Sequence, residues 1–278
     1  MTLYLAFALV FLTLWGVFYV TLPALRHGNR FVARLIARAS VRWSRVGKMN
    51  ERYAAYLPVA LIVIGGALFT AWAGDGFIDL AERVHAKSPR LQDFDTLAHA
   101  WAVSKRTPGA TSFFTVMTMI GSPPALIGLV VAVSALLIFT HRYRWFFYLL
   151  ITTGGESLLN MELKRYFARA RPAIAEMLRL AHGYSFPSGH AMGSTVVFGA
   201  LSYLAFRTAT SWRWKSAMLA LASALVLAVA LSRVYLGAHW ISDVAAGVAV
   251  GALWLSITTL AYETGRRIRL LRAMRVRR

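Results

Sequence analysis

Three polar clusters interrupt an otherwise apolar stretch between residues 164 and 243. They are KRYFARARP at 164–172, PSGH at 187–190 and SRVYLGAHWISD at 232–243. Together they supply fixed cations, two histidines, a serine and a glycine beside a histidine, and a carboxylate four residues after a histidine. These are the residue types needed to hold a phosphate group and to attack its phosphorus atom.

The third cluster has the most informative spacing. If His239 and Asp243 lie on one helix, their i,i+4 separation puts both side chains on the same face. A carboxylate in that position accepts the proton on one ring nitrogen of the histidine. The other nitrogen is then free to act as a nucleophile or a base.

Taken together, the clusters resemble the type 2 phosphatidic acid phosphatase superfamily, which includes membrane lipid phosphatases and vanadium haloperoxidases. The pattern of that family is Lys-x6-Arg-Pro, then Pro-Ser-Gly-His, then Ser-Arg-x5-His-x3-Asp. The chain has every fixed position of the pattern, in this order and with the same internal spacing. The resemblance covers the second half of the chain, and residues 1–53 lie outside it.

The resemblance implies a role for each residue in these motifs. His239 would attack phosphorus and form a phosphohistidine, Asp243 would fix its tautomer, and His190 would protonate the leaving oxygen. The phosphate oxygens would be bound by Lys164, Arg171, Ser188, the backbone N–H of Gly189 and Arg233. The alternative is that these are interfacial polar residues whose side chains reach for water.

Two further polar residues precede Lys164 at helical spacing. Glu156 and Asn160 would share one face of a helix with Lys164. A carboxylate inside a membrane span is a candidate functional residue. The alternative is a structural ion pair or hydrogen bond that supports Lys164.

Composition independently indicates an all-α integral membrane protein. Of the 278 residues, 58% are hydrophobic, and the mean hydropathy is +0.55. The absence of cysteine excludes disulfides and thiol chemistry and disfavours a zinc site, so we expect no metal and no cofactor. The formal charge of +20 is interpreted through the position of the charges in the loops, and we expect no nucleic acid partner.

Apolar runs predict a six-helix phosphatase core preceded by one extra transmembrane helix. The extra helix is expected at 3–25, where a cleavable signal peptide is disfavoured because the run lacks a basic start and a cleavage site. The core spans are expected at 54–73, 111–140, 145–163, 189–207, 215–233 and 239–262. Segment 74–109 is expected outside the membrane, and the proline pair at 123–124 should kink or restart the helix there.

Between the extra helix and the core lies a strongly basic segment. Arginines recur every four residues within 26–53, which predicts an amphipathic helix lying on anionic lipid; a solvated basic loop is the alternative. We therefore divide the chain into an N-terminal region at 1–53, a catalytic core at 54–265 and a basic cytoplasmic tail at 266–278. The sequence gives no signal for an oligomeric state.

The distribution of charge predicts the orientation. If all seven spans cross the membrane, one side carries 26–53, 141–144, 207–215 and the end of the chain from 263. These segments hold 20 of the 31 lysines and arginines. Because cytoplasmic loops are the basic ones, we expect a cytoplasmic C-terminus. The same alternation brings all three polar clusters to the opposite, outer surface.

These observations predict a metal-independent lipid phosphatase of a bacterial cytoplasmic membrane, with its site facing the periplasm or outside. A site at the membrane surface favours a lipid phosphate or diphosphate substrate, and undecaprenyl diphosphate is the first expectation. The family also contains enzymes for phosphatidylglycerol phosphate, phosphatidate and lipid A 1-phosphate. A lipid phosphotransferase would use the same residues. A transporter or scaffold without catalysis is the alternative from another class, although simple binding would not require both histidines.

Overall fold

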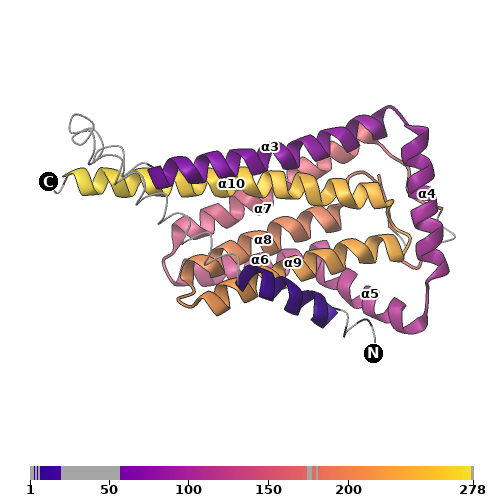
Figure 1. The fold of residues 1–278 in the computed structure, drawn as a ribbon, viewed down its shortest axis with the longest axis horizontal. Coiled ribbons are helices and arrows are strands. Elements are labelled where there is room, and N and C mark those ends of the chain that lie inside the picture. Colours follow the sequence, from indigo (N-terminus) through magenta and orange to yellow (C-terminus); the bar gives the residue numbers. More distant parts are fainter. Residues whose placement is uncertain are drawn as a thin grey trace, which may run out of the picture.

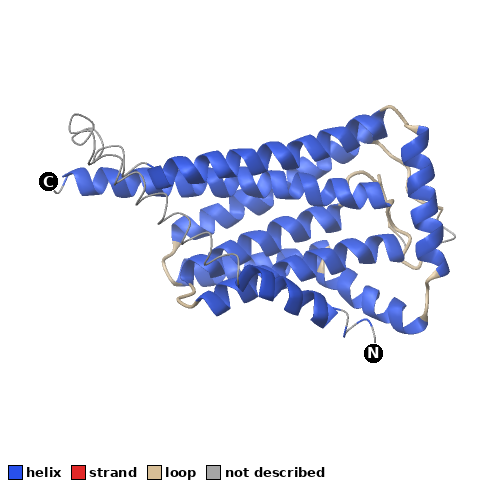
Figure 2. Cartoon of the chain, in the orientation of Figure 1, coloured by secondary structure: helices blue, strands red, loops and turns tan. Residues whose placement is uncertain are grey.

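The fold is described from a computed structural model that covers residues 3, 5, 7–19, 57–173, 177–179 and 181–276. Every regular element in these residues is a helix, which confirms the predicted fold class (Figure 2). An N-terminal helix, Phe7–Tyr19, precedes the core. The core helices are α3 (Leu57–His85), α4 (Pro89–Ser104), α5 (Pro108–Ile120), α6 (Pro123–Phe139), α7 (Tyr143–Phe167), α8 (Gly189–Thr208), α9 (Trp212–Tyr235) and α10 (Ile241–Val276).

The long helices run side by side, and α4 crosses one end of the bundle (Figure 1). Helix α10 packs against α3 on one side and α8 on the other, and α8 also packs against α9. The connections α7–α8 and α9–α10 lie at the end crossed by α4. The C-terminal end of α10 and the α6–α7 and α8–α9 turns lie at the opposite end. All three polar clusters therefore lie at the α4 end.

Three described helices are long and apolar enough to cross a membrane: segment 63–85 of α3, α9, and segment 241–270 of α10. Helices α5 and α6 together qualify as a fourth span with a bend of 45° at the break between Ile120 and Pro123. This break confirms the kink predicted from the proline pair. Helices α7 and α8 are also long, but they carry buried polar side chains such as Glu156 and Ser194. These polar groups face other helices, as expected inside a membrane bundle.

One predicted boundary is wrong. The span predicted at 54–73 continues as α3 to His85, so the start of the segment expected outside the membrane at 74–109 belongs to the same helix. Near this end Arg83 pairs with Asp79 one turn earlier, with an N–O distance of 2.8 Å. Such i,i+4 pairs stabilise a helix, which favours continuation of the helix past the end of the apolar run. The basic amphipathic segment predicted at 26–53 lies outside the described residues.

Helix α10 lies directly against the start of α8 because it has glycines at the contact. A Cβ on Gly247 would lie 2.7 Å from the backbone oxygen of Ser188, and one on Gly251 would lie 3.0 Å from that of Met192. No larger residue permits this backbone approach. The contact fixes the first turn of α8, which carries the second polar cluster, against α10.

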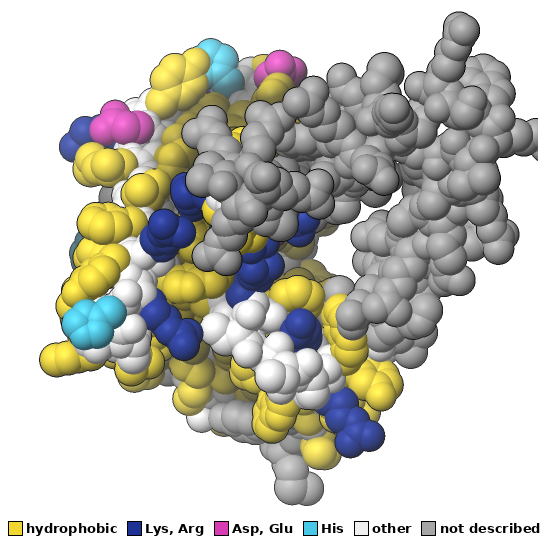
Figure 3. All heavy atoms as spheres, turned by 90° about the vertical axis from the view of Figure 1, so that its left-hand side faces the viewer, with side chains coloured by type: hydrophobic (Ala, Val, Ile, Leu, Met, Phe, Trp, Pro, Cys, Tyr) yellow, Lys and Arg dark blue, Asp and Glu magenta, His cyan; other side chains and the backbone are white. Residues whose placement is uncertain are grey.

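The end of the bundle away from α4 holds a separate charged cluster around Glu263. Its carboxylate accepts hydrogen bonds from Tyr203, Arg266 and Arg267, and Arg207 lies 3.7 Å away. Lysines and arginines gather on this face of the molecule (Figure 3). Among its basic residues are Arg142, Arg144, Arg207, Arg213 and Lys215 in or beside the two turns.

Candidate active site

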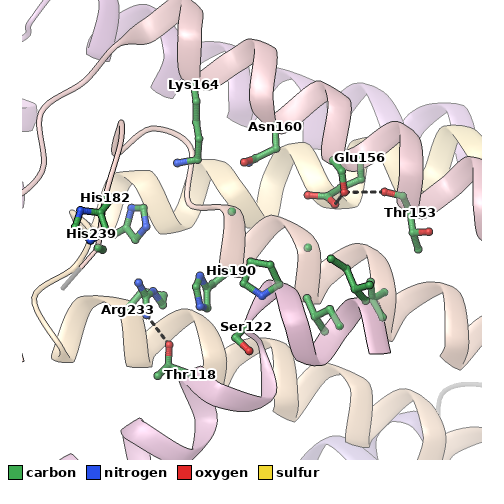
Figure 4. A pocket seen from close by; sticks show the side chains of 18 of the residues that line it. Thr118, Ser122, Thr153, Glu156, Asn160, Lys164, His182, His190, Arg233 and His239 are labelled. Carbon is green, nitrogen blue, oxygen red and sulfur yellow. Dashed lines mark hydrogen bonds between the residues drawn. The ribbon is translucent and has the colours of Figure 1, made fainter. Parts of the chain in front are cut away.

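The three polar clusters open into one cavity of about 1020 Å³ at the α4 end of the bundle (Figure 4). Its polar wall contains six of the residues predicted from the motifs, which are Lys164, Arg171, Gly189, His190, Arg233 and His239. Its apolar wall is formed mainly by α6, through Leu126, Ile127, Val130 and Val131. The cavity thus joins a cationic end to an apolar surface on α6.

His239 lies in the turn between α9 and α10, two residues before α10 begins, and Asp243 lies in the first turn of that helix. The two side chains face one another, with 3.5 Å between Nδ1 of His239 and Oδ2 of Asp243, but Nδ1 forms no hydrogen bond among the described residues. On the other side of the ring, Nη1 of Arg171 lies 3.0 Å from Nε2. Both side chains of the His239–Asp243 pair are buried. Burial lowers the pKa of His239 to about 3, although Asp243 acts in the opposite direction.

Asp243 has more partners than its spacing from His239 predicts. Its Oδ2 atom accepts hydrogen bonds from the Ser185 hydroxyl and, over 2.9 Å, from the Trp240 backbone N–H. Its Oδ1 atom lies 2.6 Å from Nη1 of Arg169. The backbone oxygen of Asp243 accepts the N–H of Ser188 over 2.9 Å, which links the second and third clusters directly.

The first cluster supplies two cations from different positions. Lys164 lies in the last turn of α7, and its Nζ donates to the backbone oxygen of Tyr184 over 2.8 Å. Arg171 lies in the loop after α7 and donates to four backbone oxygens, those of His182, Gly183, Tyr184 and Ala238. The guanidinium of Arg171 therefore holds the α7–α8 loop against the turn that carries His239.

The second cluster forms the N-terminus of α8. Ser188 is its N-cap residue, but the hydroxyl makes no capping bond and is buried without a hydrogen-bond partner among the described residues. Gly189 and His190 follow in the first turn, where backbone N–H groups are unpaired and attract anions. A Cβ on Gly189 would lie 3.1 Å from Oδ1 of Asn160, so glycine allows α7 to approach this helix start.

Arg233 lies at the end of α9 and is 5% exposed. Its Nη1 atom lies 2.5 Å from the hydroxyl of Thr118 on α5, a contact that is drawn in Figure 4. Its Nε atom is buried and has no hydrogen-bond partner among the described residues. A buried guanidinium with an unused donor beside His190 and His239 is suited to bind an anion.

Glu156 and Asn160 line the same cavity but do not support Lys164 by direct contact. Asn160 donates to the sulfur of Met192 over 3.2 Å, and Ser157 donates to Glu156 over 3.4 Å. Glu156 faces Gly193 on α8. The two turns between Glu156 and Lys164 separate them by about 12 Å along the helix, which is too far for the predicted ion pair.

Sequence reasoning missed four residues at the site. Thr118, Arg169 and Ser185 contact predicted residues directly, and Asp95 is linked to Asp243 through Arg169. Arg169 lies inside the first cluster, so its charge was a usable signal. Asp95 lies on α4, far from the motifs in sequence, among other acidic and basic residues. Nothing in its local sequence separates it from its neighbours.

Comparison with known proteins gives the class of protein that this fold and these motifs define. The family model described as the PAP2 superfamily matches residues 144–267. Phosphatidylglycerophosphatase B of Bacillus subtilis (strain 168) is 31% identical over 179 residues, which are 64% of this chain and 86% of that protein. The chain therefore belongs to the PAP2 superfamily, and it is an integral membrane lipid phosphatase, a hydrolase of phosphoric esters.

Two further proteins are similar to this chain, one over a shorter stretch of sequence and the other in three-dimensional structure. Undecaprenyl-diphosphatase of Sulfolobus acidocaldarius is 40% identical over 81 residues, covering 29% of this chain and 34% of that protein. The crystal structure of the first transmembrane PAP2 type phosphatidylglycerolphosphate phosphatase from Bacillus subtilis aligns with a TM-score of 0.64 and 28% sequence identity. That alignment covers 68% of this chain and 94% of the other.

Proposed function

We propose that the protein removes the terminal phosphate from a membrane lipid that carries two phosphate groups. Phosphatidylglycerol phosphate is the first candidate substrate. The observation that carries the proposal is the cavity, in which the phosphate-binding residues continue into an apolar wall on α6. A lipid can place its phosphate against the cations while its chains remain among apolar side chains. Arg179, at the rim of the same cavity, adds a cation outside the family motifs and supports a second phosphate group.

Undecaprenyl diphosphate is the second candidate substrate. It also carries two phosphates, and one relative is an undecaprenyl-diphosphatase. We place phosphatidylglycerol phosphate first because the relative of that name is covered over 86% of its length, against 34% for the other. The predicted outward orientation suits either lipid, and contact of anionic lipid with the basic segment 26–53 is retained as an expectation.

The proposed reaction begins with attack by Nε2 of His239 on phosphorus. A phosphorus–nitrogen bond forms as the bond from phosphorus to the lipid oxygen breaks, and His190 gives the leaving oxygen its proton. Asp243 stabilises the positive charge that develops on the ring of His239. The charge on the phosphate oxygens is neutralised by Lys164, Arg171 and Arg233 and by the N-terminus of α8.

The second half of the reaction regenerates the enzyme. His190 accepts a proton from water, whose oxygen attacks the phosphohistidine; inorganic phosphate leaves and His239 becomes neutral again. A lipid hydroxyl in place of water would give a phosphotransferase. No step requires a metal ion, because the fixed cations supply the positive charge that a metal supplies in other phosphatases.

The test is a phosphate-release assay on the purified full-length protein in excess EDTA, with the His239→Asn variant as the blank. We expect phosphate from phosphatidylglycerol phosphate and undecaprenyl diphosphate, and slower release from phosphatidate and lipid A 1-phosphate. Preference for phosphatidate would contradict the two-phosphate proposal. Transfer of label to another lipid without free phosphate would favour a phosphotransferase. Binding without turnover of any lipid would indicate a transporter or scaffold.

A further inference from the structure

A chain of charges with a buried carboxylate at each end of one arginine runs from the proposed nucleophile to a helix outside the family match. Arg169 places Nη1 2.6 Å from Oδ1 of Asp243 and Nη2 2.6 Å from Oδ2 of Asp95. Both carboxylates are buried, at 0% and 1% exposure. Asp95 lies on α4, whereas the family model matches only residues 144–267.

Asp95 is held tightly in this position. Its Oδ1 atom accepts the backbone N–H of Ser242 over 3.0 Å, and its Oδ2 atom accepts the Ser242 hydroxyl over 2.6 Å. The Ser242 hydroxyl in turn accepts a hydrogen bond from Arg169 over 2.8 Å. Asp95 therefore fixes both the guanidinium and the residue that precedes Asp243, and α4 is tied to the start of α10.

The order of charges matters for the proposed chemistry. Alone, Arg169 would neutralise Asp243 and weaken the interaction of that carboxylate with a positively charged ring. With Asp95 at the other end, two negative charges share one positive charge, and the group keeps one net negative charge. That remaining charge matches the imidazolium that forms when His239 becomes phosphorylated, in a buried setting where the interaction is weakly screened.

We propose that Asp95 is a positioning residue for phosphoryl transfer. By holding one arm of Arg169, Asp95 leaves the Asp243–Arg169–Asp95 group with one net negative charge and keeps Asp243 turned toward His239. The inference rests on the proposed role of His239 as the nucleophile. Asp95 itself does not line the cavity that holds the phosphate-binding residues, so its effect falls on the chemical step and leaves substrate binding unchanged.

The first test compares Asp95→Asn with Asp93→Asn. Both substitutions remove one negative charge from α4, but Asp93 is exposed and Asp95 is buried. We expect Asp95→Asn to lower kcat by about 10- to 100-fold, the range seen when a partner that orients a metal-ligating side chain is lost, with KM within about twofold of the native value. Asp93→Asn should leave both constants unchanged. An unchanged kcat in Asp95→Asn, or a rise in KM alone, would overturn the proposal.

A double-mutant cycle with Arg169→Lys distinguishes positioning from folding. A lysine ammonium keeps the charge but lacks the planar fork that serves two carboxylates at once, so Arg169→Lys should also lower kcat without changing KM. If Asp95 acts through Arg169, adding Asp95→Asn to this variant should cost less than about threefold more. If the reductions in kcat caused by the two substitutions multiply in the double variant, Asp95 acts independently of Arg169, and the inference is contradicted. Arg169→Lys alone provides the kcat and KM readout if Asp95→Asn does not fold.

The native protein and His239→Asn are assayed in parallel with these variants. A native protein without phosphatase activity would refute the proposed function itself. An active native protein whose Asp95→Asn variant behaves like Asp93→Asn would refute only the positioning role. The two failures are therefore distinguishable in one experiment.

Discussion

Nη1 of Arg171 lies 3.0 Å from Nε2 of His239, and this contact determines the tautomer of the ring. A guanidinium can only donate hydrogen bonds, so Nε2 must accept and carry the lone pair. The proton of the neutral ring is then on Nδ1, which faces Asp243 at 3.5 Å. Nε2 thus carries the lone pair that would attack phosphorus in the proposed mechanism, and Arg171 must release this hydrogen bond when the phosphate binds.

The two histidines should fail in different ways. His239→Asn should lower turnover by on the order of 10³-fold or more for every substrate, because no phosphohistidine can form. His190→Asn should be severe for lipid leaving groups but mild for p-nitrophenyl phosphate, whose leaving oxygen needs no proton. The measurement is kcat for both substrates. His141→Asn is the control, since His141 is exposed, lies at the opposite end of the bundle and has a positive φ that asparagine tolerates.

The pH dependence of His239 should differ from that of an exposed histidine. Burial lowers the pKa of His239 to about 3 from its ordinary value of 6.5; Arg171 and Arg233 also lower it, and Asp243 raises it. The ring should therefore remain neutral, and competent as a nucleophile, throughout the window between these values. Nitrogen NMR of histidine-labelled protein, with His239→Asn to assign the signal, should show a neutral ring at pH 5. A protonated ring at that pH would contradict this assignment.

Gly247 should be intolerant of alanine. A Cβ there would lie 2.7 Å from the Ser188 backbone oxygen and would displace the start of α8. We expect Gly247→Ala to reduce stability by about 1–3 kcal/mol through overpacking and to lower kcat, because Gly189 and His190 move with that turn. Gly128→Ala on α6 is the matched control, since nothing lies within 4 Å of its added Cβ. Thermal unfolding and kcat of both variants provide the comparison, and equal behaviour would contradict the packing argument.

The orientation can be measured by labelling single cysteines, because the native chain has none. Ala173 is exposed in the loop between the first two clusters, and Thr210 is exposed in the α8–α9 turn at the other end. A membrane-impermeant maleimide should label Ala173→Cys in intact spheroplasts and should label Thr210→Cys only after lysis. The basic residues near Thr210 are the reason for this expectation. The reverse pattern would place the site on the cytoplasmic face.

Motif spacing and the alternation of membrane spans were sufficient to predict that the three polar clusters lie at one end of the bundle. Lys164, His190 and His239 come from three segments, and alternation alone predicted that these segments end at one face. The proline pair at 123–124 predicted the break between α5 and α6. These features are local or periodic, and a single sequence expresses them directly.

The features that were not predicted depend on contacts that leave no pattern in the local sequence. Asp95 is 147 residues from Ser242, and only the crossing of α4 over the end of the bundle brings them together. The length of α3 was underestimated because hydropathy marks the end of the apolar run, whereas the helix itself continues to His85. Glu156 has the spacing of a partner for Lys164, but it lies deeper in the bundle and faces Gly193 instead.

Helix α10 sets the distance between the charged groups at the two ends of the bundle. Asp243 near its start and Glu263 toward its other end are buried carboxylates held by arginines. The twenty residues between them span about 30 Å of helix, which is about the thickness of the hydrocarbon core. The two buried carboxylates are therefore separated along α10 by about the thickness of one hydrocarbon core. Because the helix cannot shorten, we expect the bundle to tilt in a thinner bilayer, or the bilayer to thicken around the bundle.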